Sequence, residues 1–113
     1  MAANVLYYHN QNPYSSGKQR QHIVIFSATD YQASLLAILS PISLRVLLLL
    51  ASKLNWDGYA VATLDELASL IQTPKSYVNK GILELAKYDL IKKKKRSEYW
   101  IRPDVFRPAT IEL

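Results

Sequence analysis

Five consecutive cations, Lys92 to Arg96, separate two stretches of the chain that have opposite structural preferences. Before them, apolar residues recur at helical spacing up to about Leu90. After them, the segment Glu98 to Ile101 is aromatic and β-branched, which is typical of a strand. We therefore expect a basic β-hairpin over residues 90–102, with its turn at Arg96-Ser97, directly after a helix.

Capping residues divide the rest of the chain into four predicted helices. A Ser or Thr precedes each helical pattern, and Pro41 and Pro74 follow two of these caps, where proline suits the first helical turn. Thr73 is the expected cap of the last helix. Glu66 stands three residues after Thr63, which is the spacing of a capping box. The predicted helices are 30–39, 41–54, 64–71 and 74–88, and short strands are expected at 22–26 and 59–61.

The 113 residues fit a single domain, mostly helical with one small β-hairpin. We expect a flexible arm at 1–21, a folded domain at 22–108 and a tail at 109–113, because Pro103 and Pro108 should end regular structure. The most apolar stretch, 35–54, contains Pro41, Arg45 and three serines, so it predicts a buried central helix and no membrane span. The N-terminus lacks the apolar core of a secretory signal, and a cytoplasmic location is expected.

Charge is distributed unevenly along the chain. The formal net charge is +5, and ten of the fourteen Lys and Arg residues lie between Lys75 and Arg107. That segment holds only four acidic residues and is net +6, whereas the remainder is −1. A near-neutral body with one basic section is the electrostatic layout of a protein that binds a phosphate backbone. Double-stranded DNA is therefore the expected partner.

Residues 66–85 have the spacing of two helices joined by a short turn, an arrangement in which the second helix can enter the major groove. Val78 and Ile82 should lock the second helix, 74–88, onto the first. Its opposite side would then present polar residues near the helix start, where base edges are contacted: Lys75, Ser76, Tyr77, Asn79 and Lys80. Asn can bind adenine through two hydrogen bonds, and Lys can reach guanine or phosphate.

The hairpin, at about 90–102, would add backbone contacts that carry affinity without sequence information. Because side chains alternate along a strand, Lys93 and Lys95 are expected on one face, with Lys92 and Lys94 on the other. The preferred contacts are the residues nearest the tip of the hairpin, which are Lys94, Lys95 and Arg96. Lys93 is a further candidate.

Three residues in or near the strand after the turn, Glu98, Tyr99 and Trp100, have predicted contacts. Glu98 should pair with a cross-strand lysine. Tyr99 and Trp100 must point to opposite sides of the strand, and for Trp100 we favour the role of core anchor over that of base-stacking residue. For Trp56, core cover and dimer surface both remain open.

The segment from Ala62 to Phe106 resembles the winged helix of bacterial MarR-like regulators and, more closely, plasmid replication initiators of the RepL type. The shared elements are an "ELA" helix, a turn, an "S/T-V" recognition helix, "L-x-x-x-x-L-I-K" and a hairpin closing in "I-x-P-x-x-F". The resemblance covers about residues 39–106. It implies DNA binding by the exposed residues of the recognition helix and by the wing cations, in transcriptional regulation or in replication or maintenance of a mobile element.

Two positions depart from the pattern that this resemblance implies. Gln72 occupies the turn position usually held by glycine, so the chain there adopts either a left-handed backbone at some cost or a slightly different turn. Gly81 lies inside the recognition helix, which costs about 1 kcal/mol relative to alanine and can permit close packing.

Other functions are limited by what the sequence lacks. The absence of cysteine excludes disulfides, thiolate zinc sites and cysteine nucleophiles. No catalytic motif is present, and His9 and His22 lack partners at metal-ligand spacing, so we expect no enzyme activity, cofactor or small-molecule ligand. A protein-interaction module and RNA binding through the basic hairpin remain open. The apolar N-terminal strand and first helix exceed what the helix pair needs, and they predict a homodimer on a palindromic or repeated site.

Overall fold

In the computed structural model, residues 10, 20–26 and 29–112 are described, and they form four helices and five strands. The predicted arm therefore lies outside the described residues, except for residues 10, 20 and 21. In chain order the elements are β1 (Arg20–Phe26), α1 (Asp30–Ala37), α2 (Pro41–Ser52), β2 (Tyr59–Val61), α3 (Leu64–Ile71), α4 (Lys75–Lys87), β3 (Ile91–Lys95), β4 (Glu98–Ile101) and β5 (Phe106–Glu112). All four predicted helices and the predicted hairpin are confirmed, with ends that shift by up to two residues.

The strands form two antiparallel sheets, which makes the molecule an α/β domain with more β-structure than the mostly helical prediction. β2, β4 and β3 form a three-stranded sheet in that order. β1 and β5 form a separate two-stranded ribbon, in which Val24 pairs with Pro108. The expectation that Pro108 ends regular structure is therefore wrong. Both strands of a two-stranded ribbon are edge strands, where proline is tolerated.

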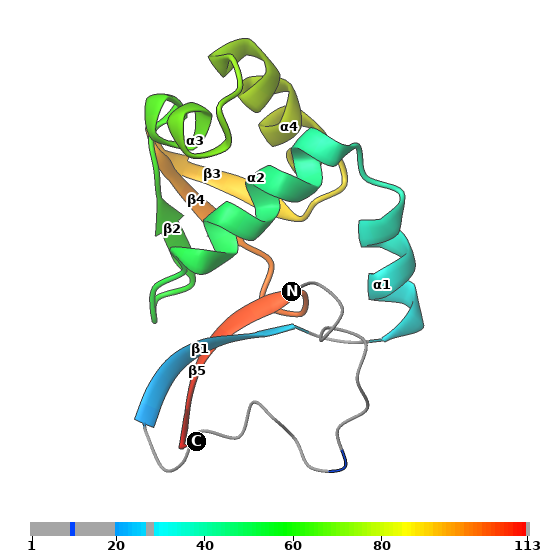
Figure 1. Ribbon diagram of the computed structural model, residues 1–113, viewed down its shortest axis with the longest axis vertical. Coiled ribbons are helices and arrows are strands. Elements are labelled where there is room, and N and C mark those ends of the chain that lie inside the picture. Colours follow the sequence, from blue (N-terminus) through cyan, green and yellow to red (C-terminus); the bar gives the residue numbers. More distant parts are fainter. Residues whose placement is uncertain (1–9, 11–19, 27–28, 113) are drawn as a thin grey trace.

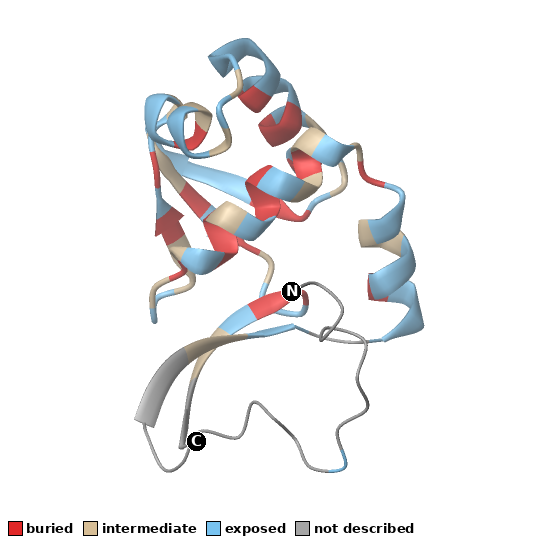
Figure 2. Cartoon of the chain, in the orientation of Figure 1, coloured by how far each residue is buried: buried red, intermediate tan, exposed pale blue. Residues whose placement is uncertain are grey.

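α2 is the central helix of the core, as its apolar sequence predicted. Ser40 caps it by accepting a hydrogen bond from the Ser43 backbone N–H at 3.4 Å, and Pro41 occupies its first turn. Its buried residues face α3, α4 and the three-stranded sheet, which all lie around it in Figures 1 and 2. Each buried Leu or Val side chain contributes about 1.5–3 kcal/mol through its removal from water. α2 is thus the frame on which α3, α4 and the hairpin are mounted.

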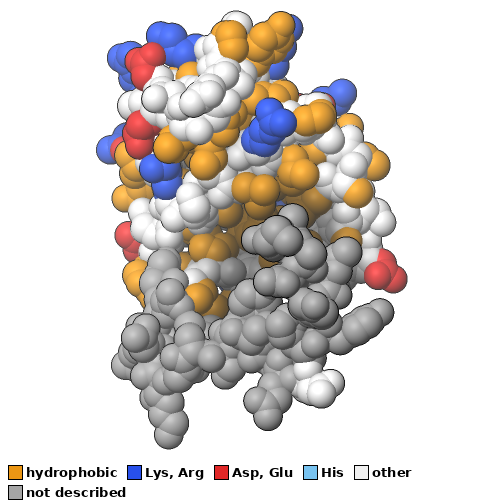
Figure 3. All heavy atoms as spheres, in the orientation of Figure 1, with side chains coloured by type: hydrophobic (Ala, Val, Ile, Leu, Met, Phe, Trp, Pro, Cys, Tyr) orange, Lys and Arg blue, Asp and Glu red, His pale blue; other side chains and the backbone are white. Residues whose placement is uncertain are grey.

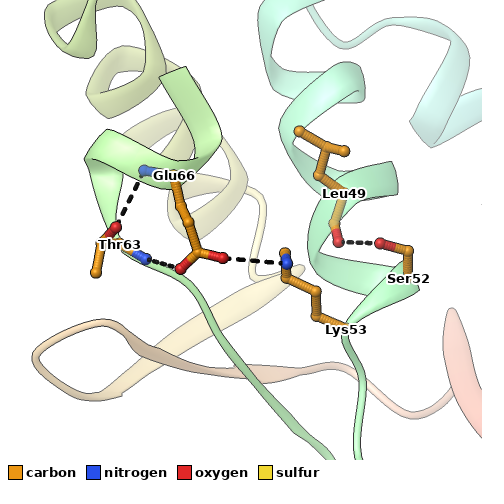
Figure 4. Close-up of polar contacts among 5 residues, drawn as sticks. All are labelled: Leu49, Ser52, Lys53, Thr63 and Glu66. Carbon is orange, nitrogen blue, oxygen red and sulfur yellow. Dashed lines mark hydrogen bonds and ion pairs between the residues drawn. The ribbon is translucent and has the colours of Figure 1, made fainter. Parts of the chain in front are cut away.

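The capping box predicted at the start of α3 is present (Figure 4). The Thr63 hydroxyl accepts a hydrogen bond from the Glu66 backbone N–H at 3.0 Å, and the Glu66 carboxylate accepts one from the Thr63 N–H at 3.3 Å. The other Glu66 oxygen binds the Lys53 ammonium at 3.2 Å, next to the end of α2. The Thr63 N–H and the Lys53 ammonium lower the pKa of Glu66 below its ordinary value. This end of α3 also adjoins the hairpin turn, because the Ala62 N–H donates to the Ser97 carbonyl oxygen at 2.9 Å.

α4 is held against the start of α2 by two kinds of contact. The backbone N–H and the hydroxyl of Ser40 bind Glu84 Oε1 at 2.9 and 3.0 Å. Gly81 is buried where an added Cβ would lie 3.3 Å from the carbonyl oxygen of Ile42. Glycine therefore permits the close helix packing that its position suggested.

In the connection between α3 and α4, the predicted N-cap of α4 is wrong. Thr73 does not cap α4, because its hydroxyl donates to the Ile71 carbonyl oxygen at 3.1 Å within the turn. Pro74 occupies the N-cap and provides no side-chain hydrogen bond. Gln72 adopts the left-handed backbone expected for this turn, with φ 50° and ψ 52°. A non-glycine residue in that conformation is strained by about 1–2 kcal/mol.

α1 and the ribbon bury less of their surface than the rest of the domain (Figure 2). In α1, Gln32 is buried and Tyr31 is 72% exposed, and Ile38, the C-cap of this helix, is 65% exposed. In the ribbon, the rings of Phe26 and Phe106 lie 5.6 Å apart, and Phe26 is still partly open to solvent. This end of the molecule therefore exposes apolar surface. No described helix is long and apolar enough to cross a membrane.

Candidate nucleic-acid interface

The exposed side of α4 presents the five residues predicted from its helical pattern. Its buried side consists of Val78, Gly81, Ile82 and Leu85, so the opposite side is open to solvent and carries Lys75, Ser76, Tyr77, Asn79 and Lys80. The Lys80 ammonium lies 5.3 Å from the centre of the Tyr77 ring, a cation–π contact along the helix. This side of α4 therefore offers cations, an amide and an aromatic ring to a ligand.

The start of α4 and the hairpin meet at a surface hollow of about 490 Å³. We call it the cationic hollow, because Lys75 from α4 lines it together with Lys93 and Arg96 from the hairpin. The remaining lining comes from the start of α3 and from the hairpin: Thr63, Leu64, Asp65, Ser97 and Tyr99. In the view of Figure 3, Lys and Arg side chains lie mainly over the part of the molecule that contains α3, α4 and the hairpin. Three cations from two separate elements thus converge on one open site.

The cations of the hollow differ in their ion pairing. Lys75 Nζ lies 3.0 Å from Asp65 Oδ1, and because both side chains are well exposed the pair contributes about 0–1 kcal/mol. Within the described part of the chain, Lys93 and Arg96 form no ion pair. Their charges are therefore available to an external anion, and Asp65 is the carboxylate that opposes an anion in the hollow.

The other hairpin lysines have different surroundings. A β-bulge between Lys93 and Lys95 interrupts the register of β3 and β4. The Lys94 and Lys95 ammonium groups lie 3.4 and 3.7 Å from the Glu98 carboxylate, which confirms the expected cross-strand pairing of Glu98. The expectation that Lys95 shares a face with Lys93 is wrong, because the bulge adds a residue to β3 and breaks the alternation. Of the three preferred tip residues, Arg96 lines the hollow.

Tyr99, and not Trp100, anchors β4 in the core. Tyr99 is 5% exposed and Trp100 is 40% exposed, so the expected role of Trp100 is wrong. Alternation along β4 places Tyr99 and Ile101 on the side that packs against the helices, and Ile91 pairs with Ile101 on that side. Burial raises the pKa of the Tyr99 phenol. Trp56 is 63% exposed, which rules out core cover as its role.

Some residues of the hollow had no signal in the sequence. Asp65 is an acidic residue in the first turn of a helix, a common and favourable position that indicates nothing about Lys75. Its proximity to Lys75 depends on how α3 and α4 cross. Ser97 has a left-handed backbone with φ 64°, which the hairpin turn requires. The described residues contain no group of His, Asp and Glu that could hold a metal ion.

The geometry of α4 and the cationic hollow is the basis for assigning a function. Comparison of the chain with protein-family models, with curated proteins and with solved structures found no match.

Proposed function

We propose that this chain is a winged-helix protein that binds double-stranded DNA with sequence specificity. In this proposal α4 is the recognition helix and β3–β4 is the wing. The observation that carries the proposal is the cationic hollow, in which Lys75 lies with Lys93 and Arg96. A phosphate bound there would contact the recognition helix and the wing together, which fixes the DNA backbone relative to both.

A backbone held at the hollow would direct the exposed side of α4 toward the adjacent groove. Lys75 is the first residue of α4, so the helix N-terminus adds its partial positive charge to the phosphate site. Asn79 and Lys80 follow about one turn later on the solvent side of the helix. Asn79 would bind an adenine edge and Lys80 a guanine or a phosphate. The wing would supply affinity, whereas α4 would supply the choice of sequence.

The proposal includes a homodimer. The exposed apolar residues of α1 and of the ribbon, including Tyr31, Ile38 and Phe26, are the proposed subunit contact. A two-fold dimer would bind palindromic half-sites about one helical turn apart. Size-exclusion chromatography with light scattering should give a dimer at micromolar concentration, and a monomer there would contradict this part of the proposal. The resemblance to winged-helix regulators and replication initiators supports a cytoplasmic, nucleoid-associated role in regulation or in mobile-element replication or maintenance.

Binding isotherms on duplex DNA test the proposed function. A cognate site is selected from a random duplex library, and its affinity is measured against salt concentration. We expect affinity to fall steeply with salt, and the absence of binding at about 50 mM salt would contradict the proposal.

Replacement of a base-contacting residue tests the role of α4. Asn79→Ala should cost about 1–3 kcal/mol on the selected site and little on random DNA. Lys87→Ala is the control, because Lys87 is an exposed residue at the other end of the same helix. Equal losses on cognate and random DNA for Asn79→Ala would contradict the assignment of α4 as the recognition helix.

A further inference from the structure

The outer face of the three-stranded sheet, turned away from the helices, carries a row of aromatic and basic side chains. Strand pairing places Tyr59 opposite Trp100, and Trp100 opposite Lys92, so one residue from each strand contributes to the row. Val61 pairs with Glu98 on the same face, two positions along the strands from Tyr59 and Trp100. Val61 is 53% exposed, and Trp100, at 40%, is the more open of the two rings on this face.

The rings of this row are arranged around a cation. The Tyr59 and Trp100 rings lie 5.3 Å apart with an angle of 75° between their planes. The Lys94 ammonium is 4.7 Å from the centre of the Tyr59 ring and 5.6 Å from that of Trp100. An exposed ring beside a cation matches one nucleotide of a single strand, whose base can stack while its phosphate replaces the Glu98 carboxylate that lies 3.4 Å from the Lys94 ammonium.

A second hollow, of about 410 Å³, adjoins Trp100 at the edge of this face. Lys92 and Arg102 line it, and both approach the same carboxylate, that of Asp89, at 3.8 and 3.9 Å. The Lys92 pair is long and exposed, so it is weak and can be exchanged for a phosphate at small cost, whereas Arg102 also forms a shorter pair with Asp104 at 2.8 Å. Among the other lining residues, exposed Pro103 suits the face of a base, and Asp57 adds a second carboxylate.

We propose that this outer face binds single-stranded nucleic acid, with Trp100 as the stacking residue and Lys92 and Lys94 as phosphate contacts. An exposed aromatic ring beside lysines favours this occupant over a second copy of the chain, because a base can stack on Trp100 while its phosphates replace the carboxylates of Asp89 and Glu98 at the lysines. A DNA duplex is disfavoured because its bases are already stacked and cannot reach Trp100. The site is independent of the cationic hollow, which lies on the helix side of the hairpin.

The test uses the intrinsic fluorescence of Trp100. The chain has two tryptophans, so Trp56→Phe leaves Trp100 as the single tryptophan, which is excited selectively at wavelengths that tyrosine does not absorb. Titration with oligo-dT of about 20 nucleotides at about 50 mM salt should quench this emission to saturation. Quenching that follows protein concentration without oligonucleotide would indicate self-association through this face and would overturn the proposal, as would the absence of saturable quenching.

Affinity measured by the anisotropy of a labelled oligonucleotide completes the test. Trp100→Ala should weaken single-strand binding roughly 5- to 150-fold, whereas Trp100→Phe should retain most of the affinity. If Trp100→Ala does not fold, Lys94→Ala serves instead and should lower the salt dependence by about one phosphate contact. Lys87→Ala is the matched control, because Lys87 is exposed and lines neither hollow, and it should leave single-strand binding unchanged. Equal losses for Lys87→Ala and Lys94→Ala would place the strand elsewhere and overturn the proposal. Duplex binding, measured on the same proteins, reports separately on the proposed function.

Discussion

The two sides of the hairpin differ in whether their cations, all from the run Lys92 to Arg96, form ion pairs. On the helix side, Lys93 and Arg96 face the cationic hollow and form no ion pair within the described residues. On the outer side, Lys94 binds the Glu98 carboxylate and two aromatic rings. Residues of equal charge and adjacent position therefore differ in how readily they can bind a phosphate. Strand geometry, and not the number of lysines, therefore determines which cations of the hairpin are open to an external anion.

Charge reversal should produce the largest separation between the two sides. Lys93→Glu with Arg96→Glu removes two available cations from the hollow and adds repulsion, so duplex affinity should fall about 100-fold or more. Lys92→Glu with Lys94→Glu makes the same change in net charge on the outer side and should cost duplex binding far less. Gel-shift titrations with one duplex compare the two proteins. Equal losses would show that the duplex responds to total charge alone.

A larger side chain at Gly81 should crowd α2 against α4 and weaken duplex binding on the helix side of the hairpin without affecting the outer side. In Gly81→Val, side-chain atoms would meet the Ile42 carbonyl oxygen, which lies 3.3 Å from the position of a Cβ. We expect a loss of about 1–3 kcal/mol in the free energy of unfolding, measured by urea denaturation. Duplex affinity should fall as α4 shifts relative to the hairpin, while the outer face keeps its single-strand affinity. A variant with unchanged stability would show that the close packing at Gly81 is dispensable.

Removal of the opposing carboxylate should strengthen the helix side. Asp65→Asn frees Lys75 from an ion pair of 3.0 Å and removes a negative charge from the hollow. The pair is worth about 0–1 kcal/mol, so duplex affinity should rise by up to about fivefold, with a steeper dependence on salt. Glu98→Gln is the matched change on the outer side, and isothermal titration should find it nearly neutral for duplex binding. Weaker binding by Asp65→Asn would mean that Asp65 positions Lys75 for DNA.

The smallest expected effect is on the pH dependence of stability. The folded state lowers the pKa of Glu66, so its contribution is complete above the unfolded pKa of about 4.5 and is lost as pH falls through the lower folded value. Loss of this cap should loosen the start of α3, which lines the hollow, and leave the outer face unaffected. Thermal unfolding measured from pH 6 down to about pH 3 should show a component that Glu66→Gln lacks. Identical pH profiles for both proteins would contradict the role of this carboxylate.

Local patterns in the sequence predicted the elements but not the relations between them. The capping box at Thr63 and the left-handed backbone at Gln72 depend on neighbours in the chain, and the structure has both. The close packing suggested for Gly81 is also present, but its partner, Ile42, lies in another helix and could not be identified from the local sequence. The pairing of β5 with β1 joins segments about 80 residues apart, and no local pattern indicates it. The opposite orientations of Tyr99 and Trp100 were predicted, but the choice between them depends on which side of β4 meets the helices.

In the candidate site, too, local features could be predicted from the sequence and contacts between elements could not. The exposed residues of α4 could be identified from helical spacing, because Val78 and Ile82 fix the buried side. The side of β3 on which each lysine lies could not be identified from the sequence, because the bulge between Lys93 and Lys95 changes the alternation on which the prediction relied. The convergence of Lys75 with Lys93 and Arg96 is a tertiary property of the fold.

The salt dependence of duplex binding for Lys93→Ala and Lys94→Ala tests the central claim most directly. The two variants remove the same charge from neighbouring residues on opposite sides of the hairpin. If the hollow holds a phosphate through Lys93, the slope of log affinity against log salt should decrease by about 0.9 for Lys93→Ala and remain unchanged for Lys94→Ala. Equal decreases for both variants, or a larger decrease for Lys94→Ala, would contradict the assignment of the helix side as the duplex interface.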